Sequence, residues 1–301
     1  MVEFLLGGSG TGKSTELISK IKEACENGRK CIVIIPDQFS FEYDKKLYNA
    51  LGAKMYNNLT VLSFGRLSSD IFMKFGGRKG SYASECVKLA LTYIAVNNVR
   101  RNNGFMYFEK RSRSGSFAKA VMNEIKELCY AGITADDLLS ASESCNGRGK
   151  SKAVDVANIF FEYERLLNER NLKDSISDVE YAAEIAKDNG YFKDTDVFID
   201  EFQTFPSDQM KMIEVIVENA DNLTVCLTTD NPLSKLPLFS AVNRSYSRIL
   251  KAIEDSGCKV KTTMMKIPHR FVSKDIALLS ENIFRNNRGG NFSSDNIKLV
   301  F

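Results

Sequence analysis

The sequence predicts an α/β fold in which a parallel β-sheet is interrupted by a long helical insertion. Short apolar runs rich in β-branched residues, such as residues 31–36 (CIVIIP), show no polar alternation. That pattern is typical of strands buried on both faces of a parallel sheet. Segments with helical periodicity separate the runs, as in βαβ units. Residues 81–190 show helical periodicity almost throughout, and we expect the insertion there.

Composition indicates a globular protein. The chain has 301 residues, of which 44% are hydrophobic and 26% are charged, and its formal net charge is +3. This length suffices for one large or two ordinary domains. The charge balance neither requires nor excludes a nucleic-acid partner.

Several classes of protein are excluded by what the sequence lacks. It has no run of about 18 apolar residues, so we expect no membrane partner. The first residues lack the basic region of a signal peptide, and we expect a cytoplasmic location. The seven cysteines form no C-x-x-C pair, and His269 is the single histidine, so neither a disulfide framework nor a zinc protease is predicted.

The first part of the predicted sheet lies before the insertion. Strands are expected at residues 2–6, 31–36 and 59–64. Between the first two, the segment TELISKIKEACENG places its apolar residues on one helical stripe and ends at Gly28, a residue type that stops helices.

The insertion and the rest of the sheet follow. Two polar segments, residues 100–116 and 146–152, are interpreted as exposed loops within the insertion. Strands return at residues 195–199 and 223–229, and residues 258–267 are a further strand candidate.

A glycine-rich segment predicts a phosphate-binding loop. Residues 7–14 (GGSGTGKS) match G-x-x-x-x-G-K-[ST] and lie between a predicted strand and a predicted helix. The glycines allow successive N–H groups to point at phosphate oxygens. The lysine neutralises the β- and γ-phosphates and the serine hydroxyl binds Mg²⁺. The alternative is a plain glycine-rich turn. The residues expected to contact ATP here are Gly8, Ser9, Gly10, Thr11, Gly12, Lys13, Ser14 and Thr15.

Two acidic residues end the strand predicted at residues 195–199. A phosphate-binding loop needs a second carboxylate site for its metal, so we expect Asp200 to hold Mg²⁺ through water and Glu201 to act as the general base. The alternative is a strand that ends in polar residues without a catalytic role.

The motifs resemble those of a helicase family. Residues 200–203 (DEFQ) resemble the D-E-x-Q motif of superfamily 1 helicases of the UvrD/Rep type, whose first motor domain is split by a helical subdomain. The ordered set is most similar to the N-terminal part of the AddB (RexB-like) subunits of bacterial AddAB helicase–nucleases. Three further segments carry this resemblance: residues 36–38 (PDQ), 61–67 (VLSFGRL) and Arg270-Phe271. It covers nearly all of the chain but only the front portion of such a subunit.

The resemblance implies a division of the chain. Residues 1–78 and 191–268 are expected to form the two parts of a RecA-like ATP-binding domain. Residues 79–190 are expected to form a helical 1B-like subdomain. Residues 269–301 are expected to start the following helicase-like region, which is truncated here.

The resemblance also implies roles for individual residues. The segments matching 36–38 and 61–66 line the single-stranded DNA path in related helicases. Arg270 matches an arginine that contacts the γ-phosphate, and Gln203 is expected to couple nucleotide state to the DNA-facing motifs. His269 replaces the aromatic residue that often precedes this arginine and is a candidate for stacking on adenine, with a simple surface or packed histidine as the alternative. The residues expected to contact DNA are Gln38, Ser63, Phe64 and Arg66.

Alternatives remain open for several of these residues. Phe64 is equally compatible with a core position, Arg66 with a surface charge and Gln203 with a solvated strand end. A basic segment with interleaved aromatics is compatible with nucleic-acid binding, but a mobile solvated loop is the favoured interpretation. Its residues are Arg100, Arg101, Tyr107, Phe108, Lys110, Arg111 and Arg113.

The implied function is that of an ATP-binding, helicase-like domain in double-strand break repair. It would use ATP and Mg²⁺, contact single-stranded or duplex DNA, and assemble with an AddA-type subunit. Thr204 stands where a UvrD-type motor carries Asp, and AddB motor halves are often degenerate, so hydrolysis is left open. The alternatives are a silent nucleotide-binding scaffold and a self-contained kinase. The resemblance places the nuclease site outside this chain.

Overall fold

The computed structural model describes residues 1–77, 79–234, 236–267, 269, 271 and 273–282. The chain divides into two compact units. The first consists of Met1–Leu67, Ala186–Phe205 and Met212–Phe301, and the second of Ser68–Ile185 and Pro206–Lys211. Among the described residues, no helix is both long enough and apolar enough to span a membrane.

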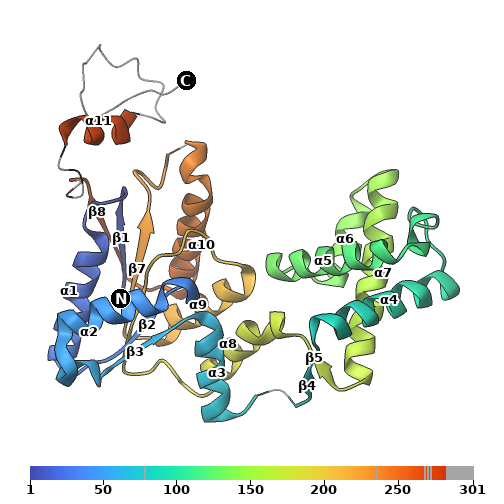
Figure 1. Cartoon of the computed structure of the whole chain (residues 1–301), viewed down its shortest axis with the longest axis horizontal. Helices are drawn as coiled ribbons and strands as arrows, with labels where there is room; N and C mark the ends of the chain where they lie inside the picture. Colours follow the sequence, from blue (N-terminus) through green and yellow to red (C-terminus); the bar gives the residue numbers. More distant parts are fainter. Residues whose placement is uncertain (78, 235, 268, 270, 272, 283–301) are drawn as a thin grey trace. The chain divides into compact units, whose positions relative to one another are not determined.

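A parallel sheet forms the centre of the first unit (Figure 1). Its strand order is β3-β2-β6-β7-β1-β8, and every neighbouring pair is parallel. Leu5 of β1 lies opposite Cys226 of β7, and Val33 of β2 lies opposite Phe198 of β6. This confirms the predicted fold class. The strands are β1 Val2–Gly7, β2 Lys30–Ile34, β3 Leu59–Leu62, β6 Thr195–Ile199, β7 Asn222–Thr228 and β8 Val260–Met265.

Helices cover both faces of this sheet. Alternate strand residues, including Leu5, Val33 and Phe198, pack with Leu17 of α1 and Leu47 of α2 in one buried cluster. On the opposite face the ring centroid of Phe4 lies 4.7 Å from that of Tyr246 in α10. Burial on both faces explains why these strands carry continuous apolar runs. The helices that belong to this unit in whole or in part are α1 Lys13–Glu26, α2 Ser40–Tyr56, α3 Phe64–Phe75, α8 Asp178–Asp188, α9 Ser207–Asn219, α10 Ser240–Ser256 and α11 Lys274–Asn282.

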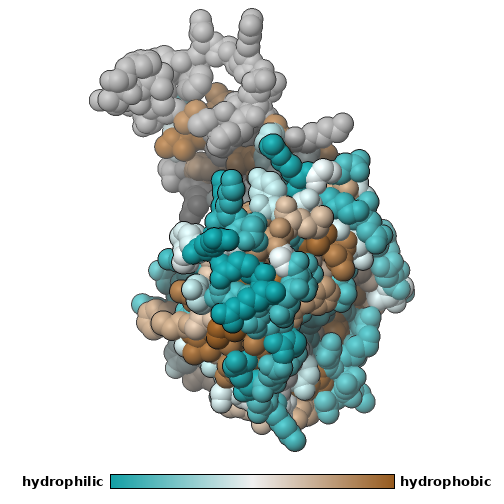
Figure 2. Space-filling model, turned by 90° about the vertical axis from the view of Figure 1, so that its right-hand side faces the viewer, coloured by the Kyte–Doolittle hydropathy of each residue, from teal (hydrophilic) through white to brown (hydrophobic). Residues whose placement is uncertain are grey.

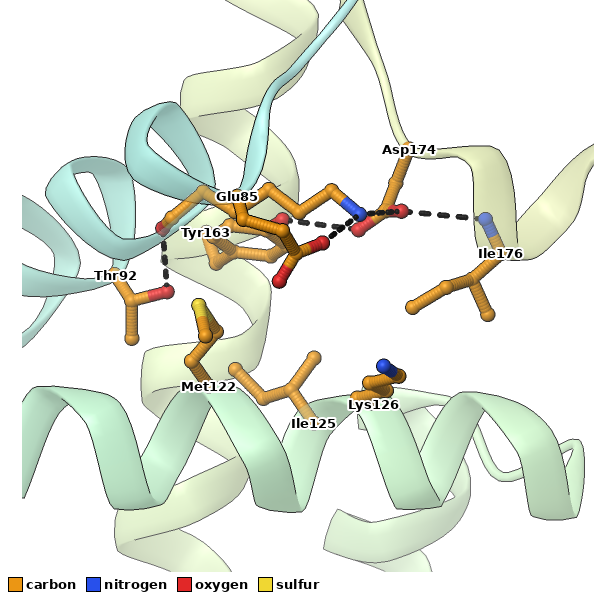
Figure 3. Close-up of a pocket in the computed structure, with 9 residues that line it drawn as sticks. Glu85, Thr92, Met122, Ile125, Lys126, Tyr163, Asp174 and Ile176 are labelled. Atoms are coloured by element: carbon orange, nitrogen blue, oxygen red, sulfur yellow. Dashed lines mark hydrogen bonds and ion pairs between the residues drawn. The ribbon is translucent and has the colours of Figure 1, made fainter.

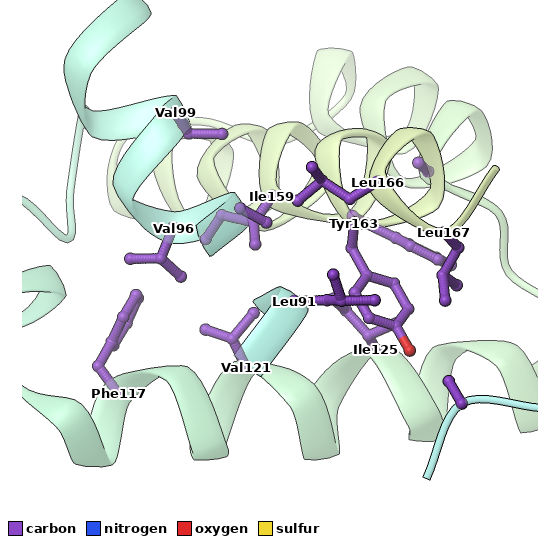
Figure 4. Packing of buried hydrophobic residues seen from close by; sticks show 14 residues of the cluster. Leu91, Val96, Val99, Phe117, Val121, Ile125, Ile159, Tyr163, Leu166 and Leu167 are labelled. Atoms are coloured by element: carbon purple, nitrogen blue, oxygen red, sulfur yellow. The ribbon is translucent and has the colours of Figure 1, made fainter. Parts of the chain in front are cut away.

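The second unit is almost entirely helical. Its apolar core is formed by α4, α5 and α7, and Val121 and Ile125 of α5 lie against Ile159 and Tyr163 of α7 (Figure 4). The helices are α4 Glu85–Asn102, α5 Gly115–Ala131, α6 Ala135–Glu143 and α7 Arg148–Glu169. This unit also contains two parallel strands of two residues each, which the sequence did not predict: β4 Ser81–Tyr82 and β5 Leu172–Lys173.

Three expected boundaries are wrong. The segment 146–152 is not a loop, because α7 begins at Arg148, directly after Gly147 turns the chain with a φ of 59°. Arg100 and Arg101 lie in the last turn of α4 rather than in a loop. Strand β3 ends at Leu62, and α3 begins at Phe64. Lysine and arginine are good helix formers with side chains that extend into solvent, so polarity alone does not indicate a loop.

Candidate functional site

The glycine-rich segment connects β1 to α1 with unusual backbone angles. Gly10 and Gly12 have φ of 78° and 88°, in the left-handed region that favours glycine. Gly12 is the N-cap residue of α1, and within the described residues no side chain caps this helix end. A Cβ atom on Gly7 would lie 2.5 Å from the Met265 carbonyl oxygen. The segment therefore presents an uncapped helix N-terminus, which attracts anions.

Lys13 is held against the same segment. Its Nζ donates hydrogen bonds to the carbonyl oxygens of Gly7 and Gly8, at 2.9 and 2.8 Å, and the residue is 8% exposed. Burial lowers the pKa of Lys13, although the acidic groups of Cys226, Asp200 and Glu201 act in the opposite direction. In the sheet only β7 separates β1 from β6, and all three strands are parallel, so the glycine-rich segment after β1 and the acidic pair after β6 lie at the same edge although they are far apart in sequence.

Asp200 follows β6 and is 4% exposed. The Tyr43 hydroxyl donates to its Oδ2 at 2.8 Å, and the backbone N–H of Glu201 donates to its Oδ1 at 2.8 Å. A carboxylate has about four acceptor positions, so these two donors fix its orientation and leave positions on both oxygens for further ligands.

Glu201 differs from its neighbour. Its side chain is exposed, and its φ of 65° is unusual for a residue with a Cβ. Residues with strained backbone angles cluster at functional sites. The angle turns the chain immediately after the strand, so the two acidic residues occupy different environments.

The residues present fit a magnesium–nucleotide group. Ser14 is the second residue of α1 and half-buried, whereas Ser9 and Thr15 are exposed. A hydroxyl and a carboxylate are the oxygen ligands that Mg²⁺ prefers, with phosphate and water completing its shell. In the described part of the chain no three His, Cys, Asp or Glu residues are grouped to bind a metal without such help.

His269 also lies beside the glycine-rich segment. Its backbone N–H donates to the Gly10 carbonyl at 2.9 Å, and its ring carbon Cδ2 lies 3.6 Å from where a Cβ on Gly12 would be. Arg270 lies outside the described residues.

The four residues expected to contact DNA lie just beyond the carboxyl ends of β2 and β3. Gln38 is exposed, and Arg66 is exposed and forms an ion pair with Asp37 at 3.6 Å. Ser63 is buried, and its Oγ accepts a hydrogen bond from the Arg66 N–H at the start of α3. The structure therefore brings the four residues together but exposes only two of them.

Phe64 belongs to the interior. Its ring is 2% exposed, and its centroid lies 5.4 Å from that of Phe202 and 6.3 Å from that of Phe205. Edge-on aromatic contacts of this kind stabilise packing. A ring held in this way cannot stack on a base, so the structure favours the core position that the sequence left open.

Gln203 lies in the segment between β6 and α9. Its side chain is exposed, and its backbone carbonyl accepts a hydrogen bond from the Ser245 hydroxyl at 3.2 Å. The exposed amide is available to a ligand, but within the described residues no hydrogen bond links it to Lys13 or Asp200.

Two residues of the site were missed by the sequence analysis. Tyr43 lies one and two helical turns before the buried Leu47 and Leu51 on α2, so the sequence indicates that it belongs to the apolar face of this helix. Its hydroxyl partner was not, because Asp200 is 157 positions away. Cys226 looked like one more apolar residue of a buried strand.

The second unit contains a pocket that is lined by both polar and apolar side chains (Figure 3). Lys88 is buried and forms ion pairs with Asp174 at 2.7 Å and Glu85 at 3.1 Å. Asp174 also accepts hydrogen bonds from the Tyr163 hydroxyl and the Ile176 N–H. Burial acts to lower the pKa of Lys88, but the two carboxylates outweigh it and raise the pKa. The groups satisfy one another, which indicates a structural network.

Comparison with known proteins gives consistent results. A family model described as "ADDB, N-terminal" matches residues 4–280. Three similar proteins are each named as a subunit of an ATP-dependent helicase/deoxyribonuclease. That of Caldanaerobacter subterraneus subsp. tengcongensis is 27% identical over 94% of this chain and 25% of its own length. Those of Clostridium botulinum and Clostridium acetobutylicum are 27% and 25% identical, over 86% and 94% of this chain and 23% and 25% of their own lengths.

These relatives are much longer than the chain, which spans about a quarter of their length. The family match, by contrast, extends from β1 into α11 and includes the glycine-rich segment, the acidic pair and the helical insertion. The chain therefore belongs to the AddB N-terminal family.

Proposed function

We propose that the first unit binds Mg·ATP at the carboxyl edge of its sheet. The observation that carries this proposal is the convergence of Lys13, at the end of the glycine-rich segment, with Asp200 and Glu201, at the end of β6. An uncapped helix N-terminus and a buried ammonium favour a polyphosphate, and the nearby carboxylates favour its divalent cation.

The residues have separate roles in this proposal. Backbone N–H groups of residues 8–15 bind phosphate oxygens, and Lys13 neutralises their charge. Ser14 and Asp200 hold Mg²⁺, which supplies charge neutralisation when bound. Glu201 is positioned outside the buried cluster, where an exposed carboxylate can accept a proton from water. Arg270 is proposed as the cation for the γ-phosphate.

We propose DNA contact at the same edge of the sheet. Gln38 and Arg66 are exposed there and are suited to phosphate and sugar contacts. Ser63 and Phe64 are proposed to support this surface, since the Ser63 hydroxyl accepts a hydrogen bond from the first turn of α3 and Phe64 packs in the aromatic cluster. Gln203 is proposed to couple nucleotide and DNA.

We propose that the chain acts within a longer helicase–nuclease subunit in DNA repair and recombination, together with an AddA-type partner. The names of its relatives support this. In this proposal residues 1–78 and 191–268 form the RecA-like domain, residues 79–190 are the 1B-like subdomain, and residues 269–301 begin the next helicase-like region.

The test of nucleotide binding is Lys13→Ala. We expect ATP affinity, measured by titration with a fluorescent analogue in the presence of Mg²⁺, to fall at least about tenfold, or about 1.4 kcal/mol. Lys22→Ala, an exposed lysine of α1 that pairs with Glu26, is the matched control and should bind ATP like the wild type. Equal affinities of the wild type and Lys13→Ala would show that the glycine-rich segment is not the nucleotide site.

A further inference from the structure

The second unit carries a concentration of positive charge that the proposed nucleotide site does not use. Residues 100–113 and 148–155 contain eight basic and two acidic residues, although the formal net charge of the whole chain is only +3. The rest of the chain is therefore net acidic. The eight basic residues are Arg100, Arg101, Lys110, Arg111, Arg113, Arg148, Lys150 and Lys152.

The two acidic residues of these segments are Glu109 and Asp155, and the second of them is buried. Asp155 of α7 is 1% exposed, and its two oxygens accept backbone N–H bonds from Met106, Tyr107 and Phe108 at 2.9, 2.8 and 3.0 Å. Three such bonds to a charged acceptor are strong. The carboxylate thus fixes the segment that joins α4 to α5, here termed the basic loop (residues 103–113).

Aromatic packing fixes the same loop from within. The rings of Phe105 and Phe108 lie 6.4 and 5.1 Å from the ring of Phe117, which belongs to the buried core of this unit. Arg100 donates to the Ser112 carbonyl at 3.3 Å and closes the far end of the loop. The loop is therefore preorganised, in contrast to the mobile segment that the sequence favoured.

The exposed side chains of the basic loop include cations, which are suited to binding a polyanion. Met106 and Tyr107 are 67% and 36% exposed, and the Lys152 ammonium lies 4.8 Å from the Tyr107 ring centroid. Lys110 and Arg111 are exposed and make no ion pair among the described residues. Hydrophilic side chains predominate in the view of Figure 2, with hydrophobic residues scattered among them.

We propose that the basic loop and the first turns of α7 form a binding surface for the sugar–phosphate backbone of DNA. Charge complementarity selects this partner, since a group of preorganised cations in excess over nearby carboxylates releases counterions from a polyanion on binding. Exposed Tyr107 adds a surface for a sugar or base. This inference extends the proposed DNA contact to a second surface, which does not depend on the nucleotide site.

The test is the double variant Lys110→Ala/Arg111→Ala in the 301-residue chain. Affinity for fluorescein-labelled single-stranded DNA and for the matching duplex is measured by anisotropy across roughly 50–300 mM salt. We expect the slope of log K against log salt to shrink by about 1–2 in at least one arm, because each lost phosphate contact contributes about 0.7 for a single strand and about 0.9 for a duplex. The arm that responds identifies the form of DNA bound.

The control is Lys193→Ala/Lys251→Ala, which removes two exposed charges from the first unit. It should leave the slope unchanged. Unchanged slopes for the loop variant in both arms, or equal losses in the control, would overturn the proposed surface. Absence of DNA binding by the wild type would overturn the proposed DNA contact as well, whereas ATP binding that depends on Lys13 would stand in either case.

Discussion

Asp200 illustrates how one residue of the site is set by its surroundings. A carboxylate with 4% exposure is costly unless it is hydrogen-bonded, and here a tyrosine hydroxyl and a backbone N–H donate to it. Burial raises the pKa of Tyr43, and the charge of Asp200 raises it further. The tyrosine therefore remains a donor at neutral pH and holds the carboxylate in one orientation.

Removing that donor gives a prediction at the scale of a residue. Tyr43→Phe keeps the packing but frees Asp200 Oδ2, so the Mg²⁺-dependent part of ATP affinity should fall about threefold to tenfold. This corresponds to about 1 kcal/mol for one hydrogen bond. Affinity in EDTA should not change. Titrations with and without Mg²⁺ measure both, and Tyr48→Phe, an exposed tyrosine of the same helix, is the control. An equal loss under both conditions would contradict the assignment.

Some of these residues can be identified from the sequence and others cannot, for a physical reason. The glycine-rich segment and the acidic pair are local patterns whose chemistry follows from residue types and spacing. The bond between Tyr43 and Asp200 depends on which strands become neighbours, here β2 and β6. Phe64 shows the same limit, since only the positions of Phe202 and Phe205 decide whether its ring faces solvent.

At the scale of elements, Glu3 connects β1 to the structures on either side. Its carboxylate forms ion pairs with Lys20 of α1 at 3.1 Å and with Lys261 of β8 at 3.0 Å. Burial acts to raise the pKa of Glu3, but these partners outweigh it and the pKa lies below its ordinary value. The ionised form is therefore favoured in the folded protein.

The sign of the pH dependence follows. A group whose pKa is lower in the folded state than in the unfolded state stabilises the protein when the pH is above the unfolded-state pKa. This stabilisation is lost as the pH falls through the folded-state pKa. Glu3→Gln should reduce the free energy of unfolding by about 1–3 kcal/mol near pH 7. The difference from the wild type should shrink towards zero below the ordinary pKa of 4.5. Urea unfolding across pH measures it, and a constant difference would exclude this linkage.

Elements were predicted better than their ends. The buried strands can be identified in the sequence as runs of continuous apolar residues. Strand β8 lies within its candidate segment, residues 258–267. The first turn of α7 contains only polar residues and a glycine. The tertiary contacts of this helix, such as those of Asp155 two turns further on, involve residues that are distant in sequence. Helix ends are decided by such tertiary partners more than by local propensity.

At the scale of the molecule, each of the two units has buried apolar clusters of its own among the described residues. Ile159 is fully buried in the core of the second unit, whereas Leu5 and Val33 are fully buried in that of the first. We therefore expect each unit to open without the other.

Ile159→Ala tests this independence. The cavity should cost about 2–5 kcal/mol, and amide hydrogen exchange should accelerate in α4, α5 and α7. Exchange in the strands of the sheet should stay close to that of the wild type. Val33→Ala, the reciprocal variant, should affect the sheet first. Uniform acceleration in both units would indicate a single cooperative unit.

The position of β1 has a consequence for biosynthesis. Its two neighbours are β7 and β8, which begin at Asn222 and Val260. At about 5–20 residues per second, a ribosome takes roughly 10–45 s to reach β7 after β1 has been made. Throughout that interval a strand with six buried residues has both backbone edges open, which is the condition under which nascent chains aggregate. The glycine-rich segment that follows β1 contacts Met265 and His269, which are translated later still.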